Sequence, residues 1–259
     1  MFTSRRISTL GGSTFSDNWS FEMNSTDSND YMNTGATYQD VLRDNLSVSC
    51  WLKSEDIQGA GLNVICGIKK DANDWFYLGI GNLGKMSYYH IAGGNTNNRN
   101  SGTAIADGPS DWLHCVWTLK KNTASTGANF YVNGDLLGSA ATNGINDDQW
   151  AAFDCNSLDF FVGSQNNAGG GGSNTFDGKF SEWAIYDKEL SAAEVKLIYN
   201  NREPFNHMEW SGTANCKGWY RFGDGNESGS GTTIYDMSGN GNNGTLIASE
   251  EGDLQGDTP

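Results

Sequence analysis

Several residue types and patterns are scarce in this chain, and each scarcity excludes a class of protein. Only 3 of the 259 residues are proline and 5 are cysteine, and no C-x-x-C spacing occurs. Neither a zinc ribbon nor a fully paired disulfide framework is therefore indicated. No apolar run is long enough to cross a bilayer, and no hydrophobic stretch follows Arg5 and Arg6. The sequence thus predicts no membrane insertion and carries no visible secretion signal.

Basic residues are also scarce, which bears on partners. The chain has 16 Lys and Arg against 31 Asp and Glu, a net charge of −15. Such a charge repels phosphate backbones, so nucleic-acid binding is not expected. The 3 histidines are far apart in sequence, and no G-x-S-x-G motif is present, so no nucleophilic hydrolase is indicated.

Glycine and aromatic residues are plentiful instead. The chain contains 34 Gly, 9 Trp, 10 Tyr and 12 Phe, and 37% of its residues are hydrophobic. Many short strands joined by tight turns, with an aromatic core, fit this composition better than helices do. The length suits one large β domain or two small ones, and β-sandwiches commonly reach this size as a single unit.

Alternating patterns locate the strands. In Leu46–Leu52 and Trp112–Leu119, apolar side chains recur at every second position, as in a half-buried strand. Asn133-Gly134 lies between two apolar runs and predicts a tight hairpin. Residues 158–162 are a nearly continuous apolar strand. Residues 92–102 are rich in Gly and Asn and are expected to form an exposed loop.

The stretch 175–200 predicts a strand followed by a helix. Residues 179–186 alternate as a strand does. Ser191 and Glu194 form an S-x-x-E capping box, and Leu190 and Val195 stand at the positions of a hydrophobic staple. This is the one short helix that the sequence indicates, at about residues 191–200.

Several phrases occur in an order that resembles a known family: NLSVSCWLK, DWLHCVWTL, FYVNGDLLGS, LDFFVGSQ and FDGKFSEWAIYDKELSAAEVKLIY. Together they resemble the laminin-G-like and pentraxin-like domains of the concanavalin A-like lectin/glucanase superfamily. The resemblance covers residues 15–200. It implies an all-β jelly-roll sandwich of two antiparallel sheets.

The domain organisation follows from this match. Residues 1–14 are interpreted as an N-terminal arm, 15–200 as the sandwich, and 201–259 as a linker and C-terminal strand pair. The segments GWYRFGDG and TTIYDMSGNGNNGTL in that tail resemble the strand pair that usually opens such a domain. The tail is therefore expected to dock on the same sandwich or on a neighbouring subunit. A chain with such a tail resembles virion-associated proteins of tailed phages.

The resemblance also implies a calcium site. Pentraxin-like members hold calcium with an acidic and amide pair before one strand and a loop after another. Here one loop is all amide, which weakens a site for a cation that prefers carboxylates. Ordinary turn-forming side chains are the alternative. The corresponding residues are Asp71, Asn73, Asp74, Gln165, Asn166 and Asn167.

Exposed aromatic side chains can stack on sugar rings. Trp75, Tyr77, Tyr88 and Tyr89 are the candidates for such a carbohydrate platform, and same-face sheet pairs are the alternative interpretation. The paired carboxylates of glycosidases in this superfamily, E-x-D-x-x-E, do not occur. Glu182 is interpreted as a structural residue at a strand edge.

The leading hypothesis is a non-enzymatic decoration or attachment protein on a virion surface, with a lectin-like sandwich that recognises glycans. Its expected partners are other virion proteins, copies of itself and cell-surface glycan, and its expected cofactor is calcium or none. Two alternatives remain: a glycan-processing enzyme of the same fold, and a purely structural capsid cement protein.

Overall fold

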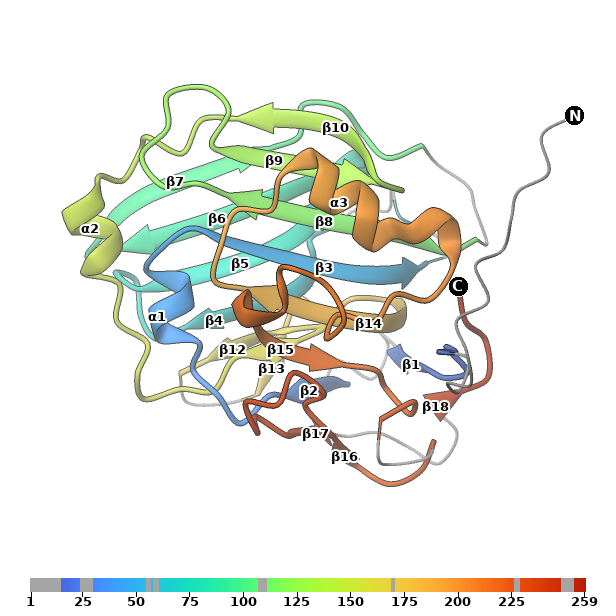
Figure 1. The fold of residues 1–259 in the computed structure, drawn as a ribbon. Helices are drawn as coiled ribbons and strands as arrows, with labels where there is room; N and C mark the ends of the chain where they lie inside the picture. The colour runs from blue at the N-terminus through green and yellow to red at the C-terminus, as the bar shows by residue number, and fades with distance from the viewer. Residues whose placement is uncertain are drawn as a thin grey trace, which may run out of the picture.

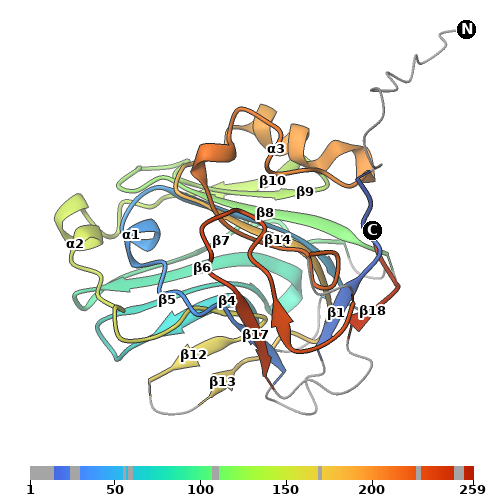
Figure 2. The same ribbon diagram turned by 60° about the horizontal axis from the view of Figure 1, so that its bottom comes forward.

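The computed structural model describes residues 15–23, 30–54, 57, 61–106, 111–168, 171–225, 229–247 and 254–259. The arm predicted for residues 1–14 lies outside them. Two β-sheets face each other and enclose the core (Figures 1 and 2). The protein is thus a mostly β sandwich of the jelly-roll kind. No helix of the described chain has the length and apolar content needed to cross a membrane.

Among the described residues, the first sheet has eight strands, drawn from early, middle and late parts of the chain. They are β1 (Ser20–Met23), β3 (Leu46–Lys53), β8 (Leu113–Leu119), β9 (Ala128–Val132), β10 (Asp135–Ala140), β14 (Gly178–Tyr186), β15 (Cys216–Tyr220) and β18 (Leu254–Gln255). Their order is β10-β9-β8-β3-β14-β1-β18, with β15 also paired to β14. Every pairing in this sheet is antiparallel.

In the same described part of the chain, the second sheet has ten strands, several of them very short. They are β2 (Tyr31–Asn33), β4 (Asn63–Lys69), β5 (Trp75–Gly81), β6 (Lys85–Ala92), β7 (Asn95–Asn100), β11 (Phe161–Val162), β12 (Gln165–Asn167), β13 (Gly172–Ser173), β16 (Thr233–Ile234) and β17 (Gly244–Ile247). The main path is β16-β17-β2-β11-β4-β5-β6-β7, and β12 pairs with β4 in parallel. The tail thus supplies β15 and β18 to one sheet and β16 and β17 to the other.

Short helices occupy the ends and one face of the sandwich. They are α1 (Gln39–Leu42), α2 (Asp147–Ala151), α3 (Ala192–Tyr199) and the 3₁₀ turns Asn82–Gly84, Asn200–Arg202 and Thr213–Asn215. The predicted capping box of α3 is confirmed, since the Ser191 hydroxyl accepts the N–H of Glu194 while the Glu194 carboxylate accepts the N–H of Ser191. Helix α3 lies across the outer face of the first sheet (Figure 1).

Two apolar clusters stabilise this arrangement. The larger one lies between the sheets and contains three fully buried tryptophans, Trp117, Trp150 and Trp183. The smaller one lies under α3, where Val195 and Ile198 pack against the first sheet. Strands such as β3 are therefore buried on both faces rather than on one. Burial of this much aromatic surface is the main stabilising contribution to such a fold.

The structure corrects three local expectations. Residues 92–102 are mostly strand β7, hydrogen-bonded along β6. All six residues of this edge strand are polar, so no alternation of apolar and polar side chains marks it in the sequence. Of the strand expected at residues 158–162, only Phe161–Val162 (β11) has strand structure. Two further short helices, α1 and α2, precede α3; each is too short to show a helical period. The hairpin at Asn133-Gly134 is confirmed, with φ of 51° and 78°.

Candidate functional site

An aromatic ridge, formed by Trp75, Tyr77 and Tyr89, lies on the outer face of the second sheet. Trp75 and Tyr77 share a face of β5 because side chains alternate along a strand, and Tyr89 stands opposite Tyr77 on β6. The Trp75 and Tyr89 ring centroids are 4.7 Å apart, and the Tyr77 and Tyr89 rings stack at 5.2 Å. Trp75 and Tyr89 are half-buried, whereas Tyr77 is 8% exposed. Three of the four predicted aromatics therefore lie together.

Tyr88 does not belong to this ridge. Its neighbours on β6 alternate to the outer face, so its own side chain enters the core, where it is fully buried. Its hydroxyl donates to the carbonyl of Ala141 at 3.1 Å. Because Tyr88 is enclosed between the sheets, it cannot stack on a ligand at the ridge, and its inclusion in the predicted platform is wrong.

Hydrogen bonds fix the orientation of the Trp75 indole. Its Nε1–H donates to Oε1 of Gln165 at 2.8 Å, and Nε2 of Gln165 donates to Oδ1 of Asn167 at 2.7 Å. Gln165 is almost fully buried. The ammonium of Lys69, the cross-strand partner of Trp75, lies 4.0 Å from the indole centroid, a cation–π contact. These contacts thus fix the orientation of the Trp75 indole in the absence of a ligand.

Two hollows lie at opposite ends of the ridge. The first, about 640 Å³, is bordered by Trp75, Lys69, Asp71 and Asn167. The second, about 540 Å³, is bordered by Tyr77, Lys85, Ser87 and neighbouring residues of β7. A rigid aromatic surface between hollows that carry both apolar and polar side chains is the kind of surface that sugars occupy.

The loop before Trp75 forms a turn that uses its own carboxylates. Oδ1 of Asp71 accepts the backbone N–H groups of Asn73 and Asp74 at 2.7 and 3.1 Å. Oδ1 of Asp74 accepts the N–H of Asp154 at 2.9 Å. These bonds match the alternative interpretation of the loop as an Asx turn.

The amides after Gly163 are also engaged with the protein. Asn166 donates to the carbonyl of Asp159 at 2.7 Å, and Asn167 donates to the Ser173 hydroxyl at 2.6 Å. The Gln165 oxygen accepts from Trp75, as described above. Among the described residues, no group of three or more His, Cys, Asp or Glu side chains could hold a metal ion. Calcium needs six to eight oxygen ligands, and this donor set does not fit it.

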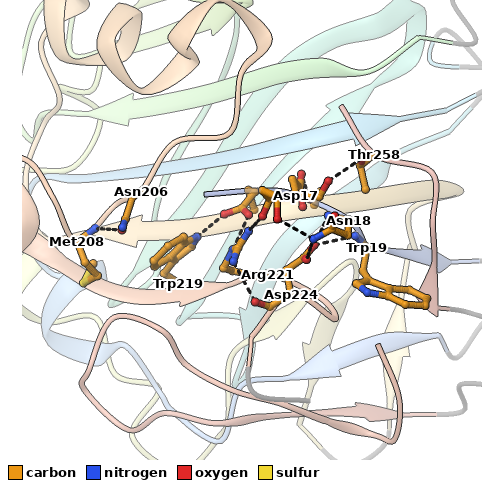
Figure 3. Close-up of polar contacts among 12 residues, drawn as sticks. Asp17, Asn18, Trp19, Asn206, Met208, Trp219, Arg221, Asp224 and Thr258 are labelled. Carbon is orange, nitrogen blue, oxygen red and sulfur yellow. Dashed lines mark hydrogen bonds and ion pairs between the residues drawn. The ribbon is translucent and has the colours of Figure 1, made fainter. Parts of the chain in front are cut away.

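A second constellation joins the two ends of the chain at β14 (Figure 3). Residues Gly178–Phe180 pair with β1, and Trp183–Tyr186 pair with β15. Glu182 lies between these partners at a bulge, with φ of 51°. Oε1 of Glu182 accepts from Arg221 Nε at 2.7 Å, and Oε2 accepts from Trp219 Nε1 at 2.6 Å. The glutamate thereby connects β14 to the tail.

The N-terminal segment completes this cluster. The Asp224 carboxylate accepts the backbone N–H groups of Asn18 and Trp19 at 2.5 and 2.7 Å, and Ser181 donates to Asp17 at 2.8 Å. Burial, followed by the charge of Glu182, raises the pKa of Asp17 to about 9.

Burial also raises the pKa of Glu182 to about 7, against the opposing effect of Arg221. Carboxylates with strongly shifted pKa values are candidates for acid–base chemistry. Glu182 and Arg221 are, however, 3% and 7% exposed, and their polar atoms already bind protein groups. The arrangement therefore holds the chain together, in agreement with the structural interpretation of Glu182. Sequence reasoning missed its partner; an arginine within the apolar run Trp219–Phe222 was the available signal.

The family model described as "Concanavalin A-like lectin/glucanases superfamily" (Laminin_G_3) matches residues 24–196. A candidate carbohydrate-binding protein from Bacteroides ovatus superposes with a TM-score of 0.60 at 20% identity; the match covers 92% of this chain and 61% of that one. The present chain therefore spans about three fifths of that protein.

A second solved structure is the Ruminococcus gnavus IT-sialidase CBM40 bound to α2,3-sialyllactose. It superposes with a TM-score of 0.52 at 14% identity, over 70% of this chain and 96% of that one. At these identities the likeness establishes a shared fold. No curated protein matches the sequence significantly.

Proposed function

Because the chain belongs to the concanavalin A-like lectin/glucanases superfamily, we propose that it is a non-enzymatic glycan-binding module whose binding surface is the aromatic ridge. The observation that carries this proposal is the fixed indole of Trp75, half-exposed beside a hollow of about 640 Å³. Sugar rings present C–H faces that pack on aromatic rings, while their hydroxyls bind nearby polar groups.

The carboxylates of the chain support a binding role over catalysis. A glycosidase needs two carboxyl groups that face the scissile bond from opposite sides. The two described carboxyl groups whose pKa values are raised, Asp17 and Glu182, belong to the junction of β14 with the chain ends. Neither borders the hollows beside the ridge.

A glycan panel read by melting temperature and titration calorimetry tests the proposal. A ligand that binds only the folded protein raises its melting temperature. We expect at least one glycan to do so for the wild type and not for Trp75→Ala. Binding that persists in Trp75→Ala would show that the site lies elsewhere. If no glycan binds, the lectin proposal is wrong. Release of reducing sugar would favour an enzyme.

We further propose, from the resemblance of the tail to phage virion proteins, that the module decorates a particle surface beside other virion proteins or copies of itself. Mass spectrometry of purified particles tests this setting. Presence of the protein at a fixed stoichiometry is the expected result, and its absence from intact particles would refute it. If the protein binds no sugar and particles that lack it are less stable, its role is that of a structural cement protein.

A further inference from the structure

We propose that the ligand of the aromatic ridge is an acidic oligosaccharide, whose anionic groups are bound by Lys69 at one end and Lys85 at the other. This inference rests on the proposed function and specifies its ligand class. The shared chemistry is a carboxylate or sulfate substituent on a sugar chain.

Lys69 occupies the first end of the ridge. It is the cross-strand partner of Trp75 and borders the hollow of about 640 Å³. Its ammonium lies over the indole at 4.0 Å. A sugar that stacks beside this ring would bring its substituents next to the ammonium, so an acidic group there would gain a charge-assisted hydrogen bond.

Lys85 occupies the other end. It stands opposite Gly81 in the β5–β6 pairing and borders the hollow of about 540 Å³, together with Tyr77 and Ser87. A Cβ at Gly81 would have only a backbone oxygen at 4.0 Å nearby. The floor of this hollow is therefore open beside the lysine, which leaves room for a ligand group.

Both ammonium groups lack a carboxylate partner within the described part of the chain. None of the ion pairs found there includes Lys69 or Lys85, whereas the neighbouring Lys70 is paired with Asp154. One acid, Asp71, borders the first hollow, and its Oδ1 accepts two backbone N–H groups. In a chain of net charge −15, an anion can bind only where cations are locally placed and free.

The separation of the two lysines sets the size of the ligand. Lys69 is paired with Trp75 on β5, and Lys85 is paired with Gly81 on the same strand. These two β5 positions are six residues apart, which corresponds to about 20 Å along a strand. A single sugar ring cannot contact both ends. The ridge between them supplies stacking for the intervening rings, so an oligosaccharide with more than one acidic group fits best.

The test compares acidic glycans with their neutralised forms. The best binder of a mixed array is titrated as it stands, after methyl esterification of its carboxylates, and after desulfation, which separates the two sources of charge. The proteins are the wild type, Lys69→Gln, Lys85→Gln and Lys120→Gln. Lys120 is exposed, lies beyond the end of β8 in the other sheet, and its substitution changes the net charge equally.

We expect neutralisation of the glycan, and each of Lys69→Gln and Lys85→Gln, to weaken binding by about three- to tenfold, while Lys120→Gln leaves it unchanged. The lysine effects should shrink as salt is raised. Tight binding of a neutral glycan that depends on Trp75 but not on the lysines would overturn this inference and leave the proposed function standing. Equal effects of all three lysine variants would also overturn it. If no glycan on the array binds, both proposals fail.

Discussion

Arg221 and Glu182 form a buried ion pair, in which Nε of the arginine donates to Oε1 of the glutamate at 2.7 Å. Glu182 lies at the point where β14 changes its partner from β1 to β15, and Arg221 directly follows β15. The pair thus fastens the tail to the middle of the sandwich. Arg221 also donates to the Asp224 carbonyl at 2.9 Å, which positions the carboxylate that binds the N-terminal segment.

Arg221→Met should destabilise the protein strongly, because it leaves the Glu182 carboxylate buried without its cation. Loss of one partner from a buried pair costs about 3–5 kcal/mol. Urea denaturation measures the change in the free energy of unfolding. The double variant Arg221→Met with Glu182→Gln should recover part of the loss. If Arg221→Met alone costs less than about 1 kcal/mol, on the scale of exposed pairs, the cluster does not stabilise the fold.

Stability should fall as pH rises from about 6.5 to 9. The pKa of Asp17 is raised from 3.8 to about 9 and that of Glu182 from 4.5 to about 7. In this window the folded state retains protons that the unfolded state has released, so rising pH favours unfolding. Asp17→Asn should flatten the decline, measured by urea titration at each pH, whereas Asp40→Asn, at an exposed carboxylate, should not. If stability declines with pH at the same rate in both variants and the wild type, the raised pKa of the buried Asp17 carboxyl group is wrong.

Stability should also fall as pH drops below about 6.5. Burial lowers the pKa of His90, His114 and His207 from 6.5 to about 3. Between these values the unfolded state binds protons that the folded state does not, so acid favours unfolding. Together with the carboxyl effect, this places maximal stability near pH 6–7. Thermal melts across pH 3–9 would locate it, and a maximum outside this range would contradict the assignment.

His90 and His207 should respond differently to the same substitution. His90 packs edge-on against Trp150 and Phe153, and neither of its nitrogens has a hydrogen-bond partner in the described residues. His207 shares a hydrogen bond with the Tyr186 hydroxyl. His90→Leu should therefore leave stability at pH 7 nearly unchanged and reduce the acid slope. His207→Leu should cost about 1–3 kcal/mol because the hydroxyl loses its partner. The reverse order in urea melts would refute this reasoning.

Trp75 and Tyr88 separate surface recognition from core packing. Trp75→Ala should abolish glycan binding with little loss of stability. Tyr88→Phe should leave binding unchanged and cost about 1 kcal/mol, because it removes the hydroxyl that donates to the Ala141 carbonyl. Calorimetric titration alongside urea melts measures both quantities. Loss of binding in Tyr88→Phe without unfolding would contradict the separation of the two faces.

Calcium should not change the stability of the protein. One carboxylate oxygen of Asp71 and one of Asp74, and the amide oxygen of Gln165, already accept protein hydrogen bonds, and these loops hold too few remaining carboxylate oxygens for a six- to eight-coordinate ion. Melting temperatures in calcium and in EDTA should agree within about 1 °C. A calcium-dependent rise would show that these loops rearrange to bind the ion.

Local patterns in the sequence predicted local structure well. The capping box of Ser191 and the hairpin at Asn133-Gly134 depend on neighbours a few residues away, so their geometry is encoded nearby. Trp75, Tyr77 and Tyr89 come together because the register of one hairpin aligns them. Tyr88, next to Tyr89 in the sequence, lies on the opposite face because successive side chains of β6 alternate.

Contacts between residues far apart in the sequence could not be predicted from such local patterns. Glu182 and Arg221 are 39 residues apart, and Asp224 binds Asn18 across 206 residues. Neither spacing follows from a helical or strand period. The bulge at Glu182 also shifts the alternation of β14, so that Phe180, Trp183 and Ile185 all face the core. A strict period of two would have placed Trp183 on the outer face.

The contribution of the tail to both sheets affects the order of events during synthesis. Strands β14, β2 and β1 receive partners from β15, β17 and β18, which leave the ribosome after the rest of the sandwich. Until then the nascent chain carries three unpaired strand edges, which can pair wrongly with other chains. Folding should therefore be completed only after translation has passed residue 255, and chaperones that shield open sheet edges would raise the yield of native protein.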